Sequence, residues 1–335
     1  METMRHIVLQ EMNEEHYNRK HIDKKIRDEI NSNPAMVEKL VQGVTLVQKY
    51  MNKTYNYTAK DGVERVLTSK IARIKQLEQL DIADLVMDCF IGVCYCQTPE
   101  LFTSVTAKMS ARLNFSDRTE AITTVAELLA VLCQTDAFDI TKATKQASLM
   151  VESCIPLSAS LLEFIENSEY LPPMVCEPLS LTHNHSSGYL THNDSLILGQ
   201  GNHHDGDICL DVLNTINKVV FQLDLDFLCK VEEDPSEITA EKIMEKALEK
   251  GKYVSEAQAV IRAKAAMDNW DAFKRQSYRF YSLMQQHDNR FYFTNKVDKR
   301  GRVYSCGYHL SPQGAPFKKA MLELAKEEIV GGVPT

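Results

Sequence analysis

The sequence "NKVDKRGRVYSCGYHLSPQGAPFKKAMLELA" covers residues 295–325 and holds the most distinctive pattern of the chain. Its first residues place four cations around one acid and one glycine, with β-prone residues on either side. This pattern predicts a strand, a turn and a second strand. A turn with Lys299, Arg300 and Arg302 beside a glycine offers N–H groups and guanidinium groups to a phosphate. Asp298 is placed to hold one of the arginines.

The composition is that of a soluble globular protein. The chain has 335 residues, of which 44% are hydrophobic and 25% charged, enough for one large domain or two modest ones. There is no apolar run of about 18 residues, so no membrane span is expected. The charged N-terminal sequence contains no signal-peptide core, and nine cysteines without paired spacing favour free thiols in a reducing compartment. These features predict a cytoplasmic protein.

The charge is distributed unevenly along the chain. The net charge is −8, yet residues 270–319 contain ten Lys or Arg against three Asp or Glu, so the rest of the chain carries −15. The same stretch holds eleven of the 26 aromatic residues. Cations attract phosphates, and aromatic rings stack on bases or support the backbone that places the cations. An aromatic core with a solvated basic rim is the alternative interpretation.

Helical periodicity dominates residues 1–170 and returns at residue 210. Pro34 is placed to begin a helix that continues to Met51, and further helices are expected over 68–96, after Asp117 and after Thr239. The run from Ser255 to about Gln286 predicts one helix of about 45 Å. The predicted class is mainly α with small β elements (α+β).

The last part of that long helix carries a row of cations. Lys274, Arg275 and Arg279 lie close together on it, and Arg275 and Arg279 are four residues apart on one face. A row of cations on a rigid helix can follow a phosphate backbone. A solvated helix face is the alternative.

The middle of the chain changes character. Prolines favour an extended backbone over 170–182. Residues 188–191 and 195–198 are then expected to form a projecting β-hairpin around a turn at His192-Asn193-Asp194.

The same region is rich in histidine and aspartate. Imidazoles and carboxylates are ligands for zinc, iron or manganese, but the spacing matches no known metal-binding module. A polar surface loop is therefore the preferred interpretation, and no metal site is predicted. The residues concerned are His183, His185, His192, Asp194, His203, His204, Asp205 and Asp207.

The stretch quoted first also resembles a known family. In order and spacing over 28 residues it is similar to the DxxGR block of the single-subunit RNA polymerases of phages and mitochondria, DxRGRxY…PQG…K-[AG]-x-L-x-[FL]-A. Weaker likenesses lie upstream, in "PPMVCEP", Gly188-Tyr189 with "LIL", and "LNTINKVVFQLD". The matching residues of the block are Asp298–Tyr304, Pro312-Gln313-Gly314, Lys319-Ala320, Leu322, Leu324 and Ala325.

The resemblance implies roles for these residues. Arg300, Arg302 and Tyr304 would contact template phosphate or base, with Lys299 beside them. Gly301 would permit close approach, and Asp298 would orient the arginines. Gln313 and Lys319 match positions near the active centre. The hairpin at about 188–198 would separate the strands at the upstream edge of the bubble. Its residues in this role are Gly188, Tyr189, Asn193, Leu196 and Ile197, with Leu196 and Ile197 stacking on a base pair.

The resemblance also implies three regions and several departures from the family. The regions are a helical N-terminal domain (1–209), a thumb-like helical region (210–287), and the DxxGR block with the first palm elements (288–335). Ala315-Pro316 replace the usual Asn-Asp, Phe221 and Asp224 replace a Trp and an Asn, and Leu181-Thr182 stand for Trp-Thr. Few residues separate Asp224 from Asp268, so the thumb is expected to be short.

The family's catalytic motifs are missing from this sequence. Phosphoryl transfer requires two palm aspartates with two Mg²⁺ ions, and these follow the DxxGR block in the family. The chain is therefore expected to be one subunit of a split phage RNA polymerase, or else a fragment. It would bind template DNA and the RNA–DNA hybrid, and have no catalytic residue of its own. A second subunit would supply fingers, palm and Mg²⁺, and the need for an accessory protein that delivers single-stranded DNA stays open.

The last residues of the quoted stretch predict a contact with the second subunit. Residues 317–330 are expected to form a helix whose apolar residues Met321, Leu322, Leu324, Ala325 and Ile329 face the second subunit. One alternative is a non-catalytic nucleic-acid-binding regulator derived from such a polymerase. The other is a metal-dependent hydrolase that uses the His/Asp cluster, in which loss of His203 or His204 would abolish activity.

Overall fold

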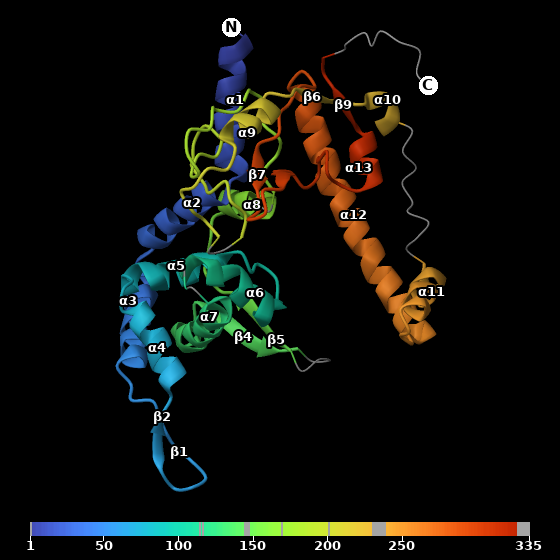
Figure 1. The fold of residues 1–335 in the computed structure, drawn as a ribbon. Coiled ribbons are helices and arrows are strands. Elements are labelled where there is room, and N and C mark those ends of the chain that lie inside the picture. Colours follow the sequence, from blue (N-terminus) through green and yellow to red (C-terminus); the bar gives the residue numbers. More distant parts are fainter. Residues whose placement is uncertain are drawn as a thin grey trace. The chain divides into compact units, whose positions relative to one another are not determined.

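The computed structural model describes residues 2–113, 115, 117–143, 148–168, 170–199, 202–229 and 239–326. They divide into two compact units. The inserted unit is formed by residues 18–169, and the terminal unit by residues up to 17 together with those from 170 onward. Helices predominate and the strands form only small sheets (Figure 1), so the predicted mainly α class with small β elements is confirmed.

The inserted unit surrounds a helical core. Asn33 caps its second helix, in which Pro34 occupies the first turn as predicted, and Asp117 caps α7 by accepting from the Glu120 N–H. Its helices are α2 (Arg19–Ser32), α3 (Pro34–Met51), α4 (Thr68–Leu77), α5 (Ile82–Cys94), α6 (Phe102–Met109), α7 (Arg118–Leu132) and α8 (Ala159–Asn167), with short 3₁₀ turns at Ser110–Leu113 and Cys133–Thr135. The helix predicted over 68–96 is two helices, because Asp81 caps a new one.

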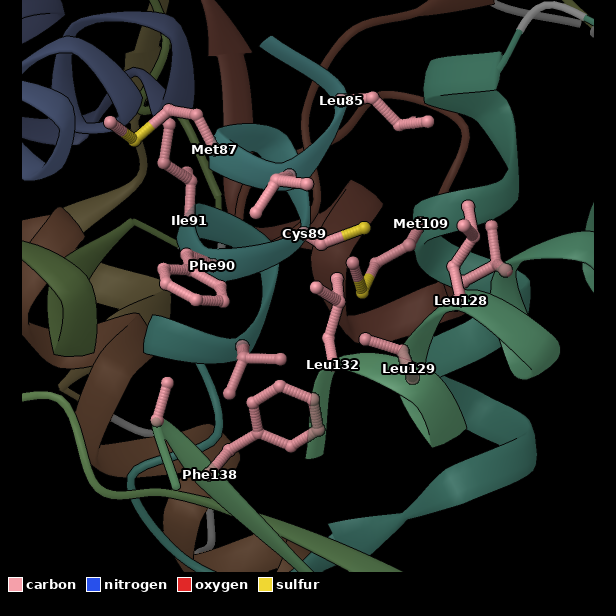
Figure 2. Close-up of a cluster of buried hydrophobic side chains, with 14 of the residues drawn as sticks. Leu85, Met87, Cys89, Phe90, Ile91, Met109, Leu128, Leu129, Leu132 and Phe138 are labelled. Carbon is pink, nitrogen blue, oxygen red and sulfur yellow. The ribbon is translucent and has the colours of Figure 1, made fainter. Parts of the chain in front are cut away.

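Two small sheets complete the inserted unit. Strands β3 (Glu100–Leu101), β5 (Leu149–Ser153) and β4 (Phe138–Lys142) are antiparallel in that order. Strands β1 (Asn56–Thr58) and β2 (Glu64–Val66) form an exposed hairpin that was not predicted. Phe90 of α5, Leu128, Leu129 and Leu132 of α7, and Phe138 of β4 are fully buried together (Figure 2).

The terminal unit contains the remaining helices and strands. Its helices are α1 (Glu2–Tyr17), α9 (Leu210–Asn217), α10 (Leu225–Leu228), α11 (Ala240–Glu249), α12 (Glu256–Gln286) and α13 (Pro316–Ala320). Its strands form two antiparallel pairs, β6 (Phe221–Leu223) with β9 (Leu322–Leu324), and β7 (Asn295–Val297) with β8 (Val303–Ser305).

The limits of this unit differ from the three regions predicted. Its main core joins Val175, Leu223, Met284 and Phe293, which come from all three of those regions, and Leu9 of α1 packs against it. Because one hydrophobic core serves them all, residues 170–209, 210–287 and 288–326 form a single unit with α1.

The long helix α12 is confirmed, with Ser255 as its N-cap. Four of its five buried residues lie between Ser277 and Met284, so its last third is the part that packs into the core. Its first part lies beside α11, which Thr239 caps as predicted and which ends before Gly251 (Figure 1).

Two helix predictions in the terminal unit are wrong. The helical pattern from residue 210 stops at Asn217, and Phe221–Leu223 form β6 instead. The predicted C-terminal helix ends at Ala320, because Leu322–Leu324 pair with β6 as β9. Met321 is buried in this chain's own core (2% exposed), whereas Leu324 is 59% exposed. Ile329 lies outside the described residues.

No helix in the described parts of the chain is both long enough and apolar enough to cross a bilayer.

A buried carboxylate ties α1 to the loop that follows residue 187. Glu14 has no exposed surface. It accepts hydrogen bonds from the backbone N–H groups of Leu190 (2.9 Å) and Thr191 (2.8 Å), and from the Gln10 amide (2.9 Å). Burial alone would raise the pKa of Glu14, but hydrogen bonds from His192, Thr191, Gln10 and Leu190 outweigh it and lower the pKa to about 2. Glu14 therefore stays ionised and holds the loop.

We expect Glu14→Gln to destabilise the protein by on the order of 3 kcal/mol at neutral pH. The folded-state pKa lies below the unfolded value of 4.5. The stabilisation is therefore complete above pH 4.5 and is lost as the pH falls towards 2. Urea unfolding across this range should give a flatter pH dependence for Glu14→Gln than for wild type. Glu11→Gln, at an exposed position of the same helix, is the control. Equal pH dependence in all three proteins would contradict the prediction.

Candidate nucleic-acid interface

The predicted strand–turn–strand is present, and β7 and β8 are joined by a tight turn over residues 298–302. The Asp298 N–H donates to the Arg302 carbonyl (3.0 Å), and the Gly301 N–H donates to the Asp298 carbonyl (2.9 Å). Such three-residue hairpin loops need a left-handed residue at their end. Gly301 has φ of +77° and adopts it without the steric cost of a Cβ. The turn itself therefore favours glycine at this position.

Asp298 organises this turn with its carboxylate. It accepts from the backbone N–H groups of Arg300 (2.8 Å) and Arg302 (3.1 Å), and Arg300 also donates its Nε (3.0 Å) and Nη2 (2.8 Å). Desolvation alone would raise the pKa of Asp298, but the hydrogen bonds from Arg302 and Arg300 lower it to about 2. The predicted orienting role of Asp298 therefore has a geometric basis for Arg300.

The cations of the turn face solvent. The side chains of Arg300 and Arg302 are 58% and 59% exposed, and Lys299 is exposed as well. Within the described part of the chain, the Arg302 guanidinium is paired only with Asp298, at 3.9 Å. Tyr304 is 36% exposed and donates its hydroxyl to Asp298 at 3.4 Å. Three cations and one acid thus leave the turn positively charged.

Gln313 has a structural role at this hairpin. Its amide oxygen accepts from the Ser305 N–H (3.0 Å), and its amide nitrogen donates to the Val303 carbonyl (2.9 Å). The amide therefore holds the Pro312-Gln313-Gly314 turn against β8. Lys319, the other residue expected near an active centre, is exposed on α13.

The cations of α12 form a second group. Lys274, Arg275 and Arg279 line a shallow groove of about 610 Å³ together with Asp271 and Tyr278. Arg275 and Arg279 are exposed, whereas Lys274 is more buried and pairs with Asp271 at 3.4 Å. The predicted row of cations thus shares one surface, with one acid among them.

Aromatic rings hold α12 to the segment that follows β8. Phe273 stacks on His309 with centroids 5.2 Å apart, and Lys318 lies over the rings of Phe273 and Tyr308. Tyr308 stacks in turn on Tyr170 at 3.9 Å. Burial, with Lys318 nearby, lowers the pKa of His309 to about 4. These rings therefore support the backbone that carries both groups of cations.

The β-hairpin predicted at 188–198 is not formed. Residues 188–191 form no strand, and Ile197 makes a parallel bridge with Val297 of β7. Leu196 and Ile197 are 1% and 5% exposed in a core with Val297, so neither is placed to stack on a base pair. The expected strand at 195–198 has β7 as its partner, a hundred residues away, instead of residues 188–191.

The other residues assigned to that hairpin stay in the same loop. Gly188 has φ of +77° and is buried, Tyr189 stacks on His192 at 4.8 Å, and Asn193 is exposed. Burial raises the pKa of Tyr189. This segment is a packed loop.

Sequence reasoning missed the residues that fix β7. Asn295 is 2% exposed, donates to the Asn217 side chain (2.9 Å) and accepts from the Ser305 hydroxyl (2.8 Å). Lys296 pairs with Asp194 at 2.6 Å. A polar residue within an apolar strand pattern was the only sequence signal for Asn295, and its partner Asn217, although part of the quoted segment "LNTINKVVFQLD", was not recognised as a partner.

No protein-family model and no curated protein matches this chain. The features of this chain that bear on function are the geometry of the two groups of cations and the sequence resemblance.

Replacing Gly301 tests the turn. No atom lies within 4 Å of a Cβ built at Gly301, so the cost of Gly301→Ala is the left-handed backbone, about 1 kcal/mol. We expect faster amide hydrogen exchange over residues 298–302 in Gly301→Ala, and a smaller effect in Gly301→Asn, because asparagine tolerates this conformation. Gly62→Ala imposes the same strain on the β1–β2 turn (φ +77°) and should leave residues 298–302 unchanged. Equal exchange in the alanine and asparagine variants of Gly301 would contradict the assignment.

Proposed function

We propose that this chain is the template-binding subunit of a split RNA polymerase of the single-subunit phage type. In this proposal it binds template DNA and the RNA–DNA hybrid and performs no chemistry alone. The observation that carries the proposal is the turn at 298–302, which Asp298 and Gly301 shape and which presents Lys299, Arg300 and Arg302 to solvent.

The geometry of this turn suits a phosphate backbone. Arg302 and Lys299 have the charge and exposure for direct phosphate contacts, and guanidinium groups bind phosphate oxygens in pairs. Arg300 is oriented by Asp298, so part of its charge is already neutralised within the protein. Arg302 is therefore the strongest contact expected, and Asp298 acts as a positioning residue.

In this proposal the groove on α12 contacts the same nucleic acid. Arg275 and Arg279 are exposed one helical turn apart, which suits contacts along a nucleic-acid backbone. Since Phe273 and Tyr308 link α12 to the segment after β8, both groups of cations belong to one support. A second contact surface for the same nucleic acid is assigned to α12.

The catalytic Mg²⁺ ions belong to the second subunit in this proposal. Among the described residues, the one group of three or more potential ligand side chains is His185, His203 and Asp205. It has a single carboxylate, whereas Mg²⁺ prefers oxygen ligands. The residues described here therefore do not fit the two-metal site of a polymerase, and no chemical step is assigned to them.

The partner and the cellular setting follow from the same proposal. The second subunit carries the fingers and palm, and Leu324 of β9, which is 59% exposed, is among the apolar residues expected to contact it. The site of action is the cytoplasm of a phage-infected bacterial cell. An accessory protein that delivers single-stranded DNA is compatible with this arrangement.

Arg302→Ala is expected to weaken binding of a labelled RNA–DNA hybrid about tenfold, because one charge-assisted phosphate contact is lost. The slope of log K against log salt should fall by roughly 0.7–0.9. Fluorescence anisotropy over a salt series measures both quantities. Arg118→Ala, at an exposed arginine in α7 of the inserted unit, is the matched control and should leave both unchanged. Equal effects of the two variants would exclude a specific role of the turn.

RNA synthesis tests the polymerase assignment itself. Primer extension on a bubble template is measured with this chain alone, with its proposed second subunit alone, and with both together. Synthesis only with both chains, reduced by Arg302→Ala, supports the proposal. Hybrid binding without synthesis in any combination would favour the non-catalytic regulator instead.

A further inference from the structure

Two loops of the terminal unit bring nitrogen and oxygen ligands together. Potential ligand atoms of His185, His203 and Asp205 all lie within 4.8 Å of one another. The His203 Nε2 and Asp205 Oδ1 atoms are 3.3 Å apart. Around a tetrahedral ion with bonds of about 2.0–2.2 Å, neighbouring ligand atoms lie roughly 3.3–3.6 Å apart. This pair already has the spacing of two ligands of one ion, and His185 is exposed, so its ring has room to turn towards the same point.

A hydrogen bond outside the cluster orients His203. Its Nδ1 lies 3.1 Å from the Ser195 hydroxyl, which also lies 3.4 Å from the Ile197 carbonyl. When Ser195 donates to that carbonyl, its oxygen accepts from the protonated Nδ1, and the Nε2 lone pair points to Asp205. Metal-bound histidines typically donate their second ring N–H to an oxygen acceptor, and the Ser195 hydroxyl takes that place here.

The backbone around the cluster is fixed by a buried amide. Asn184 is 7% exposed, and its amide nitrogen donates to the carbonyls of His204 (2.6 Å) and Gly206 (2.8 Å). Its own carbonyl accepts from the Leu196 N–H (2.8 Å). One residue therefore joins the loop that carries His185 to the loop that carries His203 and Asp205. This scaffold sets the backbone positions of the two loops before any ion binds.

We propose that His185, His203 and Asp205 bind one Zn²⁺ ion. Two imidazoles and one carboxylate form a nitrogen-rich set of the kind that binds Zn²⁺, and they suit Mg²⁺ poorly. Three protein ligands leave a fourth position for water. This inference is independent of the proposed polymerase function.

The ion would fasten the loop that lies against β7. Ser195 is flanked by Asp194, which pairs with Lys296, and by Leu196, whose carbonyl accepts from the Val297 N–H (2.8 Å). Holding His203 through Ser195 therefore stabilises the segment beside the strand that leads into the basic turn. The assigned role is structural, and no reaction is assigned to the ion.

Zn²⁺ titration of the tag-free, chelator-treated chain tests the site. Competition with a chromophoric chelator should give one equivalent per chain, and thermal unfolding should shift upwards with Zn²⁺ but not with Mg²⁺. Asp205→Asn changes a side chain that is 97% exposed, so it keeps the fold while removing a ligand. It should abolish both signals, as should His203→Gln. Ser195→Ala should weaken binding about 10–100-fold.

His204→Ala is the matched control, because His204 adjoins His203 but lies outside the ligand group, and it should bind Zn²⁺ as wild type does. The proposal is overturned if wild type takes up no stoichiometric Zn²⁺, or if Asp205→Asn and His203→Gln bind it as tightly as wild type.

Discussion

The terminal unit depends on one extended segment, residues 291–297, which forms backbone hydrogen bonds with four other parts of the chain. Phe291 pairs with Phe221, Tyr292 with Met174, and Val297 with residues 196–198. On its other side the segment pairs with β8. Buried backbone N–H and C=O groups require hydrogen-bond partners. Because residues 291–297 find theirs in four segments of the chain, the segment cannot shift without breaking several hydrogen bonds at once. The basic turn begins at the next residue, Asp298, so its position is set by the hydrogen bonds of this segment.

Charge and backbone geometry support each other at that turn. Gly301 permits the left-handed residue, and the loop then brings the N–H groups of Arg300 and Arg302 to one carboxylate. The same carboxylate restrains the Arg300 side chain. A restrained cation loses less conformational entropy on binding than a free one. Asp298 therefore lowers the net positive charge of the loop, but it also holds the Arg300 guanidinium in one orientation.

Local patterns could be predicted from the sequence, and pairings between distant segments could not. The caps at Asp117 and Thr239, and the start of the long helix at Ser255, were correct because a helix start depends on neighbouring residues. The turn at 298–302 was correct for the same reason. The sequence at 195–198 indicated an extended backbone for Leu196 and Ile197, but it did not identify β7 as their partner.

Other errors have the same physical origin. Leu322–Leu324 favour a helix locally, yet three backbone pairs with β6 and the burial of Met321 outweigh that preference. Glu14 looked like one more charge on a polar helix, because its partners Leu190 and Thr191 lie far away in the sequence. The part of the candidate site that is one hairpin, β7 and β8 with their turn, was predictable because its residues are neighbours in the sequence. The supports of that hairpin, Asn295 with Asn217, became visible only in the fold.

The overall acidity of the chain is consistent with a basic contact surface. Charges beyond about 8–10 Å are screened at physiological salt, so a phosphate at the turn interacts mainly with Lys299, Arg300, Arg302 and Asp298. The −15 carried by the residues outside 270–319 would repel phosphates locally on the surfaces where those residues lie. In the proposed function, concentrating positive charge on the two groups of cations, and excess negative charge elsewhere, would restrict where nucleic acid binds. A uniformly basic protein of the same size would bind phosphate on many faces, and its bound strand would have no defined position.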